Sequence, residues 1–277
     1  MMPCVNFDRE FEKYLSAWMK EHAAEYRDVD AMEAVVPDVY ETWLDTPAAW
    51  LSGAKPGEYF DQFTDAELLV SWMAQYFQER VPVPDMLLNR VAEMGLAAES
   101  PLMALLDKES SGADLRMTAV NLLREIDSIA PLQQYVAWQA TRREGPDELC
   151  DNALDSLDAM GDRAVDAMRS ALPAATPDGQ EALLALLSNY PGDETVFQTA
   201  LQLFQARRDR AAILAQCLGR LGDDRALPAL TARAASEETP YLDYIELRNA
   251  IEQLGGDAPE RVFDAVDPAY EALRGKQ

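Results

Sequence analysis

A helix-ending pair of residues, one apolar and the next a helix breaker, recurs six times in the last two thirds of this 277-residue chain. Glycine suits the end of a helix because it tolerates positive φ, and proline cannot continue a helix. The pairs are spaced by 32, 34, 30, 31 and 33 residues, and the Asp127 copy departs from the pattern. The six pairs are Met94-Gly95, Ile126-Asp127, Met160-Gly161, Tyr190-Pro191, Leu221-Gly222 and Leu254-Gly255. Two helices in each period of this length are typical of a helical solenoid.

The residues seven and three positions before each pair are apolar in all six copies. Residues four apart share one face of a helix. These residues are Leu87 and Val91, Ala119 and Leu123, Ala153 and Leu157, Leu183 and Leu187, Leu214 and Leu218, and Leu247 and Ile251. The pattern predicts six amphipathic helices with the same buried face, and strand-like alternation is absent from this part of the sequence.

Two segments carry a resemblance to a known family. Residues 217–230, CLGRLGDDRALPAL, resemble a HEAT-like repeat of the phycobilisome-lyase type, and residues 246–256, ELRNAIEQLGG, resemble the second helix of the next repeat. Residues 121–132 and 152–162 resemble it less closely. The resemblance covers roughly residues 83–256 and implies an all-α, right-handed α-solenoid of HEAT-like helix pairs. Such repeats imply a scaffold, so no lyase activity is carried over from the family name.

The N-terminal part is unusually aromatic, because 14 of the 23 aromatic residues precede residue 78. Apolar spacing predicts an amphipathic helix over residues 7–26, and the sequence Thr64-Asp65-Ala66-Glu67 predicts a capping box at the start of another. We expect an aromatic-rich helical cap over residues 1–82, repeats over 83–256 and a C-terminal cap over 257–277. The second cap would bury Phe263, Val266, Tyr270 and Leu273.

A ligand pocket is the alternative to a cap at the N-terminal end. It would lie where residues 1–82 meet the first repeats, because apolar pockets often form at such junctions. Its expected lining is Trp43, Trp50, Tyr59, Phe60 and Trp72. On this alternative the chain is an enzyme or a small-ligand-binding protein.

Residues with catalytic chemistry are few. His22 is the sole histidine, and we interpret it as a solvated residue of a charged helix. Cys217 lies on the apolar face of its helix, and Cys150 precedes Asp151, which would raise the pKa of a thiol. The sequence contains neither a glycine-rich phosphate loop nor a GxSxG elbow. We therefore expect no catalytic residue and no cofactor.

Acidic residues at helical spacing give no metal site by themselves. Asp151, Asp155, Asp158 and Asp162 share one helix face, but a rigid helix cannot wrap a cation as a loop can. We interpret this stripe as a solvated face.

Arginines gather in two inter-helix turns. Arg142 and Arg143 lie in the first turn, and Arg207, Arg208 and Arg210 lie in the second. We expect them to bond the carbonyl groups at helix C-termini, and a local site for an acidic partner is the alternative.

A polar column follows the same repeated helices. The residues five positions before each helix-ending pair are amides or acids in five of the six copies, although asparagine is unfavourable in mid-helix. Equivalent positions of a solenoid stack along one surface, and asparagine can pair with the backbone of an extended peptide, as in the asparagine ladder of armadillo repeats. With the polar residues four positions further on, the candidate partner-binding residues are Asn89, Glu93, Asn121, Glu125, Asp155, Asn189, Gln216, Arg220, Asn249 and Gln253. The alternative is that they face solvent or bond the neighbouring helix.

The formal net charge of −25 constrains the partners. Long-range attraction favours a basic protein or peptide, and nucleic acid is not expected because phosphate affinity needs clustered lysine and arginine. No apolar run is long enough to cross a membrane, and residues 1–12 do not resemble a secretory signal. Three cysteines without a pairing pattern indicate a reducing compartment. The sequence therefore predicts a cytoplasmic, non-enzymatic scaffold with a protein or peptide partner.

Overall fold

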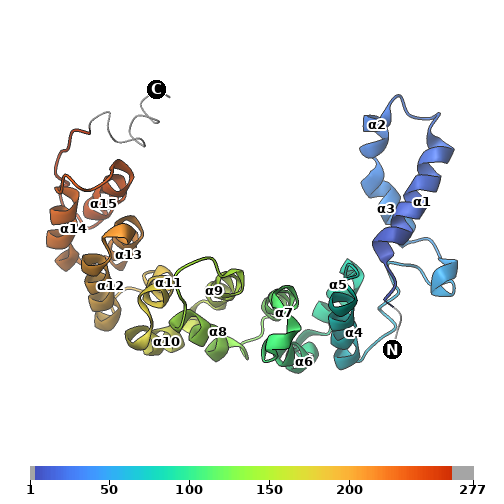
Figure 1. Ribbon diagram of the computed structural model, residues 1–277, viewed down its shortest axis with the longest axis horizontal. Coiled ribbons are helices and arrows are strands. Elements are labelled where there is room, and N and C mark those ends of the chain that lie inside the picture. The colour runs from blue at the N-terminus through green and yellow to red at the C-terminus, as the bar shows by residue number, and fades with distance from the viewer. Residues whose placement is uncertain (1–3, 264–277) are drawn as a thin grey trace. The chain divides into compact units, whose positions relative to one another are not determined.

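The structure is a computed structural model that describes residues 4–263 (Figure 1). Every regular element in this range is a helix, so the predicted all-α class is confirmed. The chain forms two compact units, residues 1–130 and 131–277, which we describe separately. None of the helices in the described range is both long and apolar enough to cross a membrane.

In its described residues, the first unit contains three N-terminal α-helices, α1 to α3, followed by two helix pairs. Helix α1 packs against α3, α4 packs against α5, and α6 packs against α7. The second helices of the last two pairs, α5 and α7, also contact each other. The bounds are α1 Phe7–His22, α2 Val29–Glu33, α3 Val36–Leu44, η1 Ala49–Leu51, α4 Ala66–Glu79, α5 Asp85–Glu93, η2 Gly95–Ala98, α6 Glu99–Leu106, η3 Glu109–Ser111 and α7 Ala113–Glu125.

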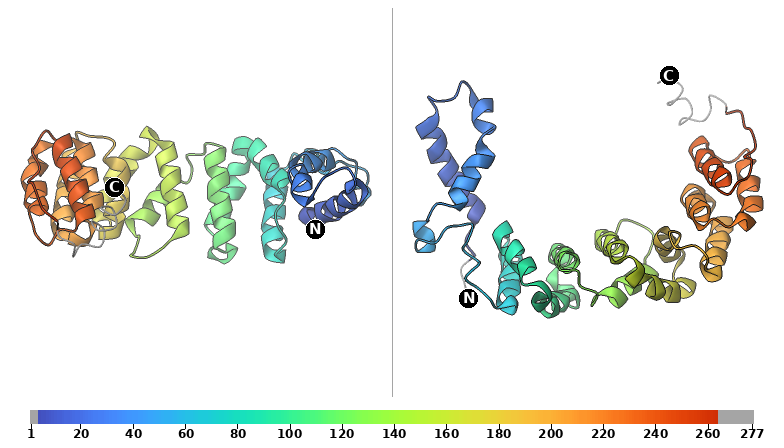
Figure 2. Two further views of the ribbon diagram at one scale, coloured as in Figure 1. Left: turned by 90° about the horizontal axis from the view of Figure 1, so that it is seen from above. Right: turned by 180° about the vertical axis from the view of Figure 1, so that it is seen from behind.

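The second unit is a succession of helix pairs (Figure 2). Helix α8 packs against α9, α12 against α13, and α14 against α15, and the second helices α11, α13 and α15 contact one another in turn. The bounds are α8 Leu132–Ala140, α9 Glu148–Met160, α10 Asp162–Ala171, η4 Leu172–Ala174, α11 Pro177–Leu187, α12 Glu194–Ala206, η5 Arg208–Arg210, α13 Ala211–Leu221, η6 Asp224–Ala226, α14 Leu227–Ala234 and α15 Tyr241–Gln253.

The predicted repeated face forms the core of both units. All twelve apolar residues that the period singles out have an exposed fraction of 0%. They lie on α5, α7, α9, α11, α13 and α15, which are the six helices that the pattern predicted. Burial of this face removes apolar side chains from water, which is the main favourable term in folding.

The predicted helix breakers have the expected backbone conformation. Gly95, Gly161, Gly222 and Gly255 have φ values between +56° and +79°. Asp127, the exception in the sequence pattern, has φ +54° and therefore takes the same left-handed conformation. Aspartate can adopt this conformation more readily than most non-glycine residues. The exception in sequence is thus not an exception in structure.

Two helix ends differ from the sequence prediction. Helix α1 ends at His22 rather than near residue 26. The N-cap of α4 is Asp65 and not Thr64, because the Asp65 side chain accepts a hydrogen bond from the backbone amide of Leu68. An aspartate at this position satisfies an amide that the first turn leaves unpaired.

The two compact units do not follow the segments predicted from sequence. The unit boundary lies between residues 130 and 131, whereas the sequence placed a division between residues 82 and 83. Helices α4 and α5 flank that predicted division and pack against each other. An N-terminal cap over residues 1–82 therefore stays a prediction.

The C-terminal cap is described only in part. The Phe263 ring lies 5.0 Å from the ring of Tyr241 and 5.1 Å from that of Tyr244. Val266, Tyr270 and Leu273, which the sequence also assigned to this cap, lie outside the described residues.

Candidate interaction surface

The predicted polar column lies on exposed helix faces in both units. All ten candidate residues are exposed, while the twelve repeated apolar residues on the same helices are fully buried. In the first unit, α5 carries Asn89 and Glu93, and α7 carries Asn121 and Glu125. Helices α5 and α7 contact each other, so these four side chains lie on neighbouring helices of that unit.

Local hydrogen bonds occupy some of the polar groups in the first unit. Arg124 Nη2 donates to Asn121 Oδ1 at 3.0 Å, and Arg90 Nη1 donates to Glu93 Oε2 at 3.0 Å. Asn89 and Glu125 form no side-chain hydrogen bond within the described part of the chain. Both remain open to an external donor or acceptor.

In the second unit, two column residues link neighbouring helices. Gln216 Nε2 on α13 donates to Glu246 Oε2 on α15 at 2.9 Å. Arg220 Nε donates to Ser188 Oγ, which lies just after α11, at 2.9 Å. Arg220 Nη2 also donates to the carbonyl oxygen of Ala185 at 3.3 Å. For Gln216 and Arg220 the alternative interpretation, a bond to the neighbouring helix, is therefore the observed one.

The other column residues of the second unit make no such links. Asp155 on α9, Asn189 after α11 and Asn249 on α15 form no side-chain hydrogen bond among residues 4–263. The Gln253 side chain lies against Gly219 of α13, because a Cβ atom built on that glycine would stand 2.7 Å from Gln253 Oε1. The column in this unit is thus a mixture of helix-linking residues and residues free to bind.

A groove of about 480 Å³ brings together the two arginine turns that the sequence singled out. Arg142, Arg143, Arg207 and Arg210 all line it, although the two turns lie some 65 residues apart in the sequence. The groove crosses the N-terminal ends of α9, α11 and α13 and includes Ala185, a position of the polar column. Arg208 of the second turn lines a different pocket.

Four of the five arginines of these turns, all but Arg143, bond to carboxylates, so the expectation that they bond helix carbonyls is wrong for these four. Arg207 Nη1 is 2.8 Å from Asp178 Oδ1, and Arg210 Nε is 2.8 Å from Glu181 Oε2. Arg142 forms an ion pair with Asp151. The hydrogen bonds that Arg210 donates to the Glu181 carboxylate raise the pKa of Arg210 above its ordinary value. Charged hydrogen bonds of this fork type are stronger than neutral ones and hold neighbouring helices in register.

In the second unit, many side-chain hydrogen bonds join residues that are about one repeat length apart in the sequence. The residues joined lie 29 apart for Arg207–Asp178 and Arg210–Glu181, and 30 apart for Arg208–Glu238. Further pairs are Gln216–Glu246 at 30, Arg225–Glu194 at 31 and Arg220–Ser188 at 32 residues. Sequence reasoning missed these bridges, although arginines one period away from acids were a signal that could have located them.

The N-terminal aromatic residues contact one another. The ring centroids lie 6.4 Å apart for Trp43–Trp50, 5.1 Å for Tyr59–Phe60 and 6.4 Å for Phe60–Trp72. Trp43 and Phe60 are buried, Tyr59 and Trp72 are half-buried, and Trp50 is 37% exposed. These rings pack together as a small core.

His22 is not a freely solvated residue. Its ring stacks on that of Trp18 with centroids 4.5 Å apart, and its Nδ1 donates to the backbone oxygen of Trp18 at 2.9 Å. The interpretation of His22 as a solvated surface residue therefore holds only in part, because the residue is half-buried against the aromatic neighbour one turn earlier.

Three of the four aspartates of the predicted stripe, Asp151, Asp155 and Asp158, lie on α9 and are exposed, as predicted. Asp162 is also exposed, but it begins α10 after the break at Gly161, so the prediction of one helix face is wrong for this residue. No cluster of metal-ligating side chains occurs within residues 4–263.

Burial makes two of the cysteines poor nucleophiles. Cys217 has 0% exposure and Cys150 has 8%. Burial raises the pKa of Cys150 to about 12, and the carboxylate of Asp147 contributes in the same direction. Burial also raises the pKa of Cys217. A thiol that stays protonated at neutral pH cannot attack a substrate.

We expect both thiols to be protected from alkylation in the folded protein. At pH 8, Cys150 should react with iodoacetamide at least about a hundred times more slowly than in the urea-unfolded chain, because little thiolate forms and access is restricted. Mass spectrometry of peptides after timed labelling would measure both rates. Equal rates at Cys150 in folded and unfolded protein would contradict the burial described above.

The chain was also compared with known proteins. No family model, no curated protein and no solved structure matches it.

Proposed function

We propose that this chain is a non-enzymatic scaffold, a right-handed α-solenoid of HEAT-like helix pairs that binds a protein or an extended peptide. The binding surface is the exposed face of the second helices, on the concave side that such a solenoid would have. The observation that carries the proposal is the contrast on these helices between twelve apolar residues with 0% exposure and ten polar residues that are all exposed.

The free amides favour peptide binding over a purely structural role. Asn89 and Asn249 are exposed and form no side-chain hydrogen bond to other described residues. Asparagine in the middle of a helix costs about 0.6 kcal/mol relative to alanine, and here no local bond offsets that cost. One asparagine side chain can donate to a peptide carbonyl and accept from a peptide amide at the same time.

Charge favours a basic partner. The net charge of −25 attracts cations over a distance of about one Debye length, and Glu93, Glu125 and Asp155 add acidic groups to the proposed surface. Nucleic acid is disfavoured by the same charge. The three cysteines are free, which suits the reducing cytoplasm.

Replacing the asparagines of the column tests the proposal. The triple variant Asn89→Ala, Asn121→Ala, Asn249→Ala should bind the partner about tenfold more weakly than the unchanged protein, because each substitution removes up to two hydrogen bonds from the complex. The partner would be recovered from host lysate and identified by mass spectrometry. Its affinity for each variant would then be measured by calorimetry with the purified partner.

The matched control is a polar residue on a first helix. Gln202 on α12 is exposed, and its replacement by alanine should leave the affinity within about twofold of the original. Circular dichroism must show equal helix content in all three proteins. Retention of full affinity by the triple variant would refute the column as the binding surface.

A further inference from the structure

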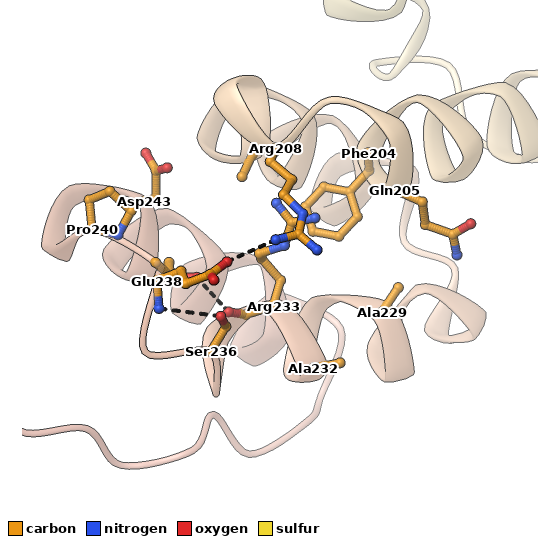
Figure 3. Close-up of a pocket in the computed structure, with 12 residues that line it drawn as sticks. Phe204, Gln205, Arg208, Ala229, Ala232, Arg233, Ser236, Glu238, Pro240 and Asp243 are labelled. Carbon is orange, nitrogen blue, oxygen red and sulfur yellow. Dashed lines mark hydrogen bonds and ion pairs between the residues drawn. The ribbon is translucent and has the colours of Figure 1, made fainter.

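A second pocket, of about 490 Å³, lies between α12, α14 and the loop that joins α14 to α15 (Figure 3). Its lining includes Phe204 from α12, Arg208 from η5, Arg233 from α14 and Glu238 from the loop. None of the ten column residues lines it, so it is separate from the surface proposed above.

Two guanidinium groups meet in this pocket. Figure 3 shows the side chains of Arg208 and Arg233 reaching toward each other beside the Phe204 ring. The guanidinium of Arg233 lies 5.4 Å from the centroid of that ring, and Phe204 is 1% exposed. Arg233 forms no side-chain hydrogen bond or ion pair among the described residues, and its charged neighbour in the pocket is the Asp243 carboxylate, with which it interacts electrostatically. Its planar donor fork is therefore held in place by the aromatic ring and is available to an anion.

The Arg208 guanidinium is already paired with a carboxylate of the chain, that of Glu238. Arg208 Nη1 lies 2.8 Å from Glu238 Oε2, and the two side chains are 75% and 77% exposed. An ion pair this exposed contributes little to stability. Glu238 therefore shows that the pocket accepts a carboxylate, and a second carboxylate can displace it at small cost.

Hydrogen bonds brace the loop that carries Glu238. Thr239 Oγ1 donates to the backbone oxygen of Arg233 at 2.7 Å. Arg261 Nη1 donates to the backbone oxygen of Thr239 at 3.0 Å, and Arg261 Nη2 donates to that of Glu237 at 3.4 Å. Because the walls are braced, a ligand would meet a preformed pocket and would lose less entropy on binding.

We propose that this pocket binds a carboxylate group of a peptide, held by the guanidinium groups of Arg208 and Arg233 beside the Phe204 ring in place of Glu238. A carboxylate matches the guanidinium fork with two parallel hydrogen bonds. Asp243 also lines the pocket, so the two arginines and the two acids balance in formal charge. The pocket therefore has no excess positive charge, and the chain as a whole has a net charge of −25. A doubly charged phosphate would be repelled more strongly than a singly charged carboxylate, so the carboxylate is favoured.

Three matched probes distinguish the source of the carboxylate. N-acetylglutamate N-methylamide carries a side-chain carboxylate, N-acetylglutamine carries a terminal carboxylate, and N-acetylglutamine N-methylamide carries none. Each would be titrated into the full-length protein while the Nε–H resonances of Arg208 and Arg233 are followed by NMR. We expect saturable shifts with a Kd on the order of 1 mM for at least one of the two acids, and none for the neutral amide.

Two substitutions in the pocket should change this affinity in opposite directions. Glu238→Gln removes the internal competitor and should strengthen binding about fivefold, which a merely structural role of Glu238 would not produce. Arg233→Lys keeps the charge but loses the planar fork, and should weaken binding about tenfold. Arg248→Lys is the matched control, because Arg248 is an exposed arginine of α15 that is paired with Glu252.

With the two acids, the neutral amide and the variants, four results would overturn the proposal. They are the absence of shifts with both acids up to 20-fold above the expected Kd, equal shifts with the neutral amide, weaker binding by the Glu238→Gln variant, and equal losses in the Arg233→Lys and Arg248→Lys variants. Inorganic phosphate serves as a fourth probe, and tighter binding of phosphate than of either acid would overturn the choice of a carboxylate.

Discussion

Replacing Gly179 by alanine should destabilise the protein by about 3 kcal/mol, although alanine is the better helix former. Gly179 lies in the first turn of α11, where the backbone of α8 approaches closely. A Cβ atom at this position would overlap with the carbonyl oxygen of Gln139 and lie 3.0 Å from that of Ala140. Backbone atoms cannot swing aside as the end of a flexible side chain can. Urea denaturation monitored by circular dichroism would give the free energy of unfolding.

The surroundings of Gly179 leave little room for relaxation. The carbonyl oxygen of Ala140 accepts a hydrogen bond from the backbone amide of Thr176 at 2.9 Å. Gln139 is fully buried, and its Nε2 donates to the backbone oxygen of Cys150 at 2.6 Å. A shift of α8 away from α11 would therefore strain bonds to α9 as well. We therefore expect the clash to lower the free energy of unfolding, because a small movement of α8 cannot relieve it.

Gly192→Ala is the comparison variant. Gly192 has φ +96°, and an added Cβ would meet nothing within 4 Å, so only backbone strain applies. That strain costs about 1–2 kcal/mol for a single residue. A loss for Gly179→Ala no larger than that for Gly192→Ala would show that α8 and α11 are not as close as described.

The apolar period could be predicted from the sequence because its physical basis is local. Leu87 and Ile251 lie on different helices, yet each was located by counting back from a helix-ending pair, and each has 0% exposure. Spacing within one helix fixes which side chains share a face. Helix breakers were predictable for the same reason, since glycine signals positive φ whatever surrounds it.

Contacts between distant segments could not be predicted in this way. The sequence singled out Arg142 and Arg207 separately, but only the fold places both in one groove. The partners of Gln216 and Arg220 depend on how far apart neighbouring second helices lie, which sequence spacing does not specify. The pocket of Arg233 and Glu238 went unnoticed because its residues come from several elements with no common motif.

Replacing Leu218 by alanine should cost about 3 kcal/mol in the free energy of unfolding. Leu218 is one of the twelve repeated apolar residues and has 0% exposure on α13. Helix α13 contacts α11, α12 and α15, so its buried face contributes to packing with several neighbours. Removing the side chain would lose the transfer free energy of the buried carbons and leave a cavity that these helices can close only in part. Thermal and urea unfolding would both report the loss.

Ile213→Ala on the same helix is the matched control. Isoleucine and leucine have the same number of carbon atoms, but Ile213 is 37% exposed and lines the arginine groove instead of the core. Its replacement should therefore cost less than about 1.5 kcal/mol. If the two variants lost equal stability, the face defined by the period would not be the buried one. The polar column five residues before each helix-ending pair would then lose its structural basis. The buried apolar face and the exposed polar column both depend on which side of each helix faces the core.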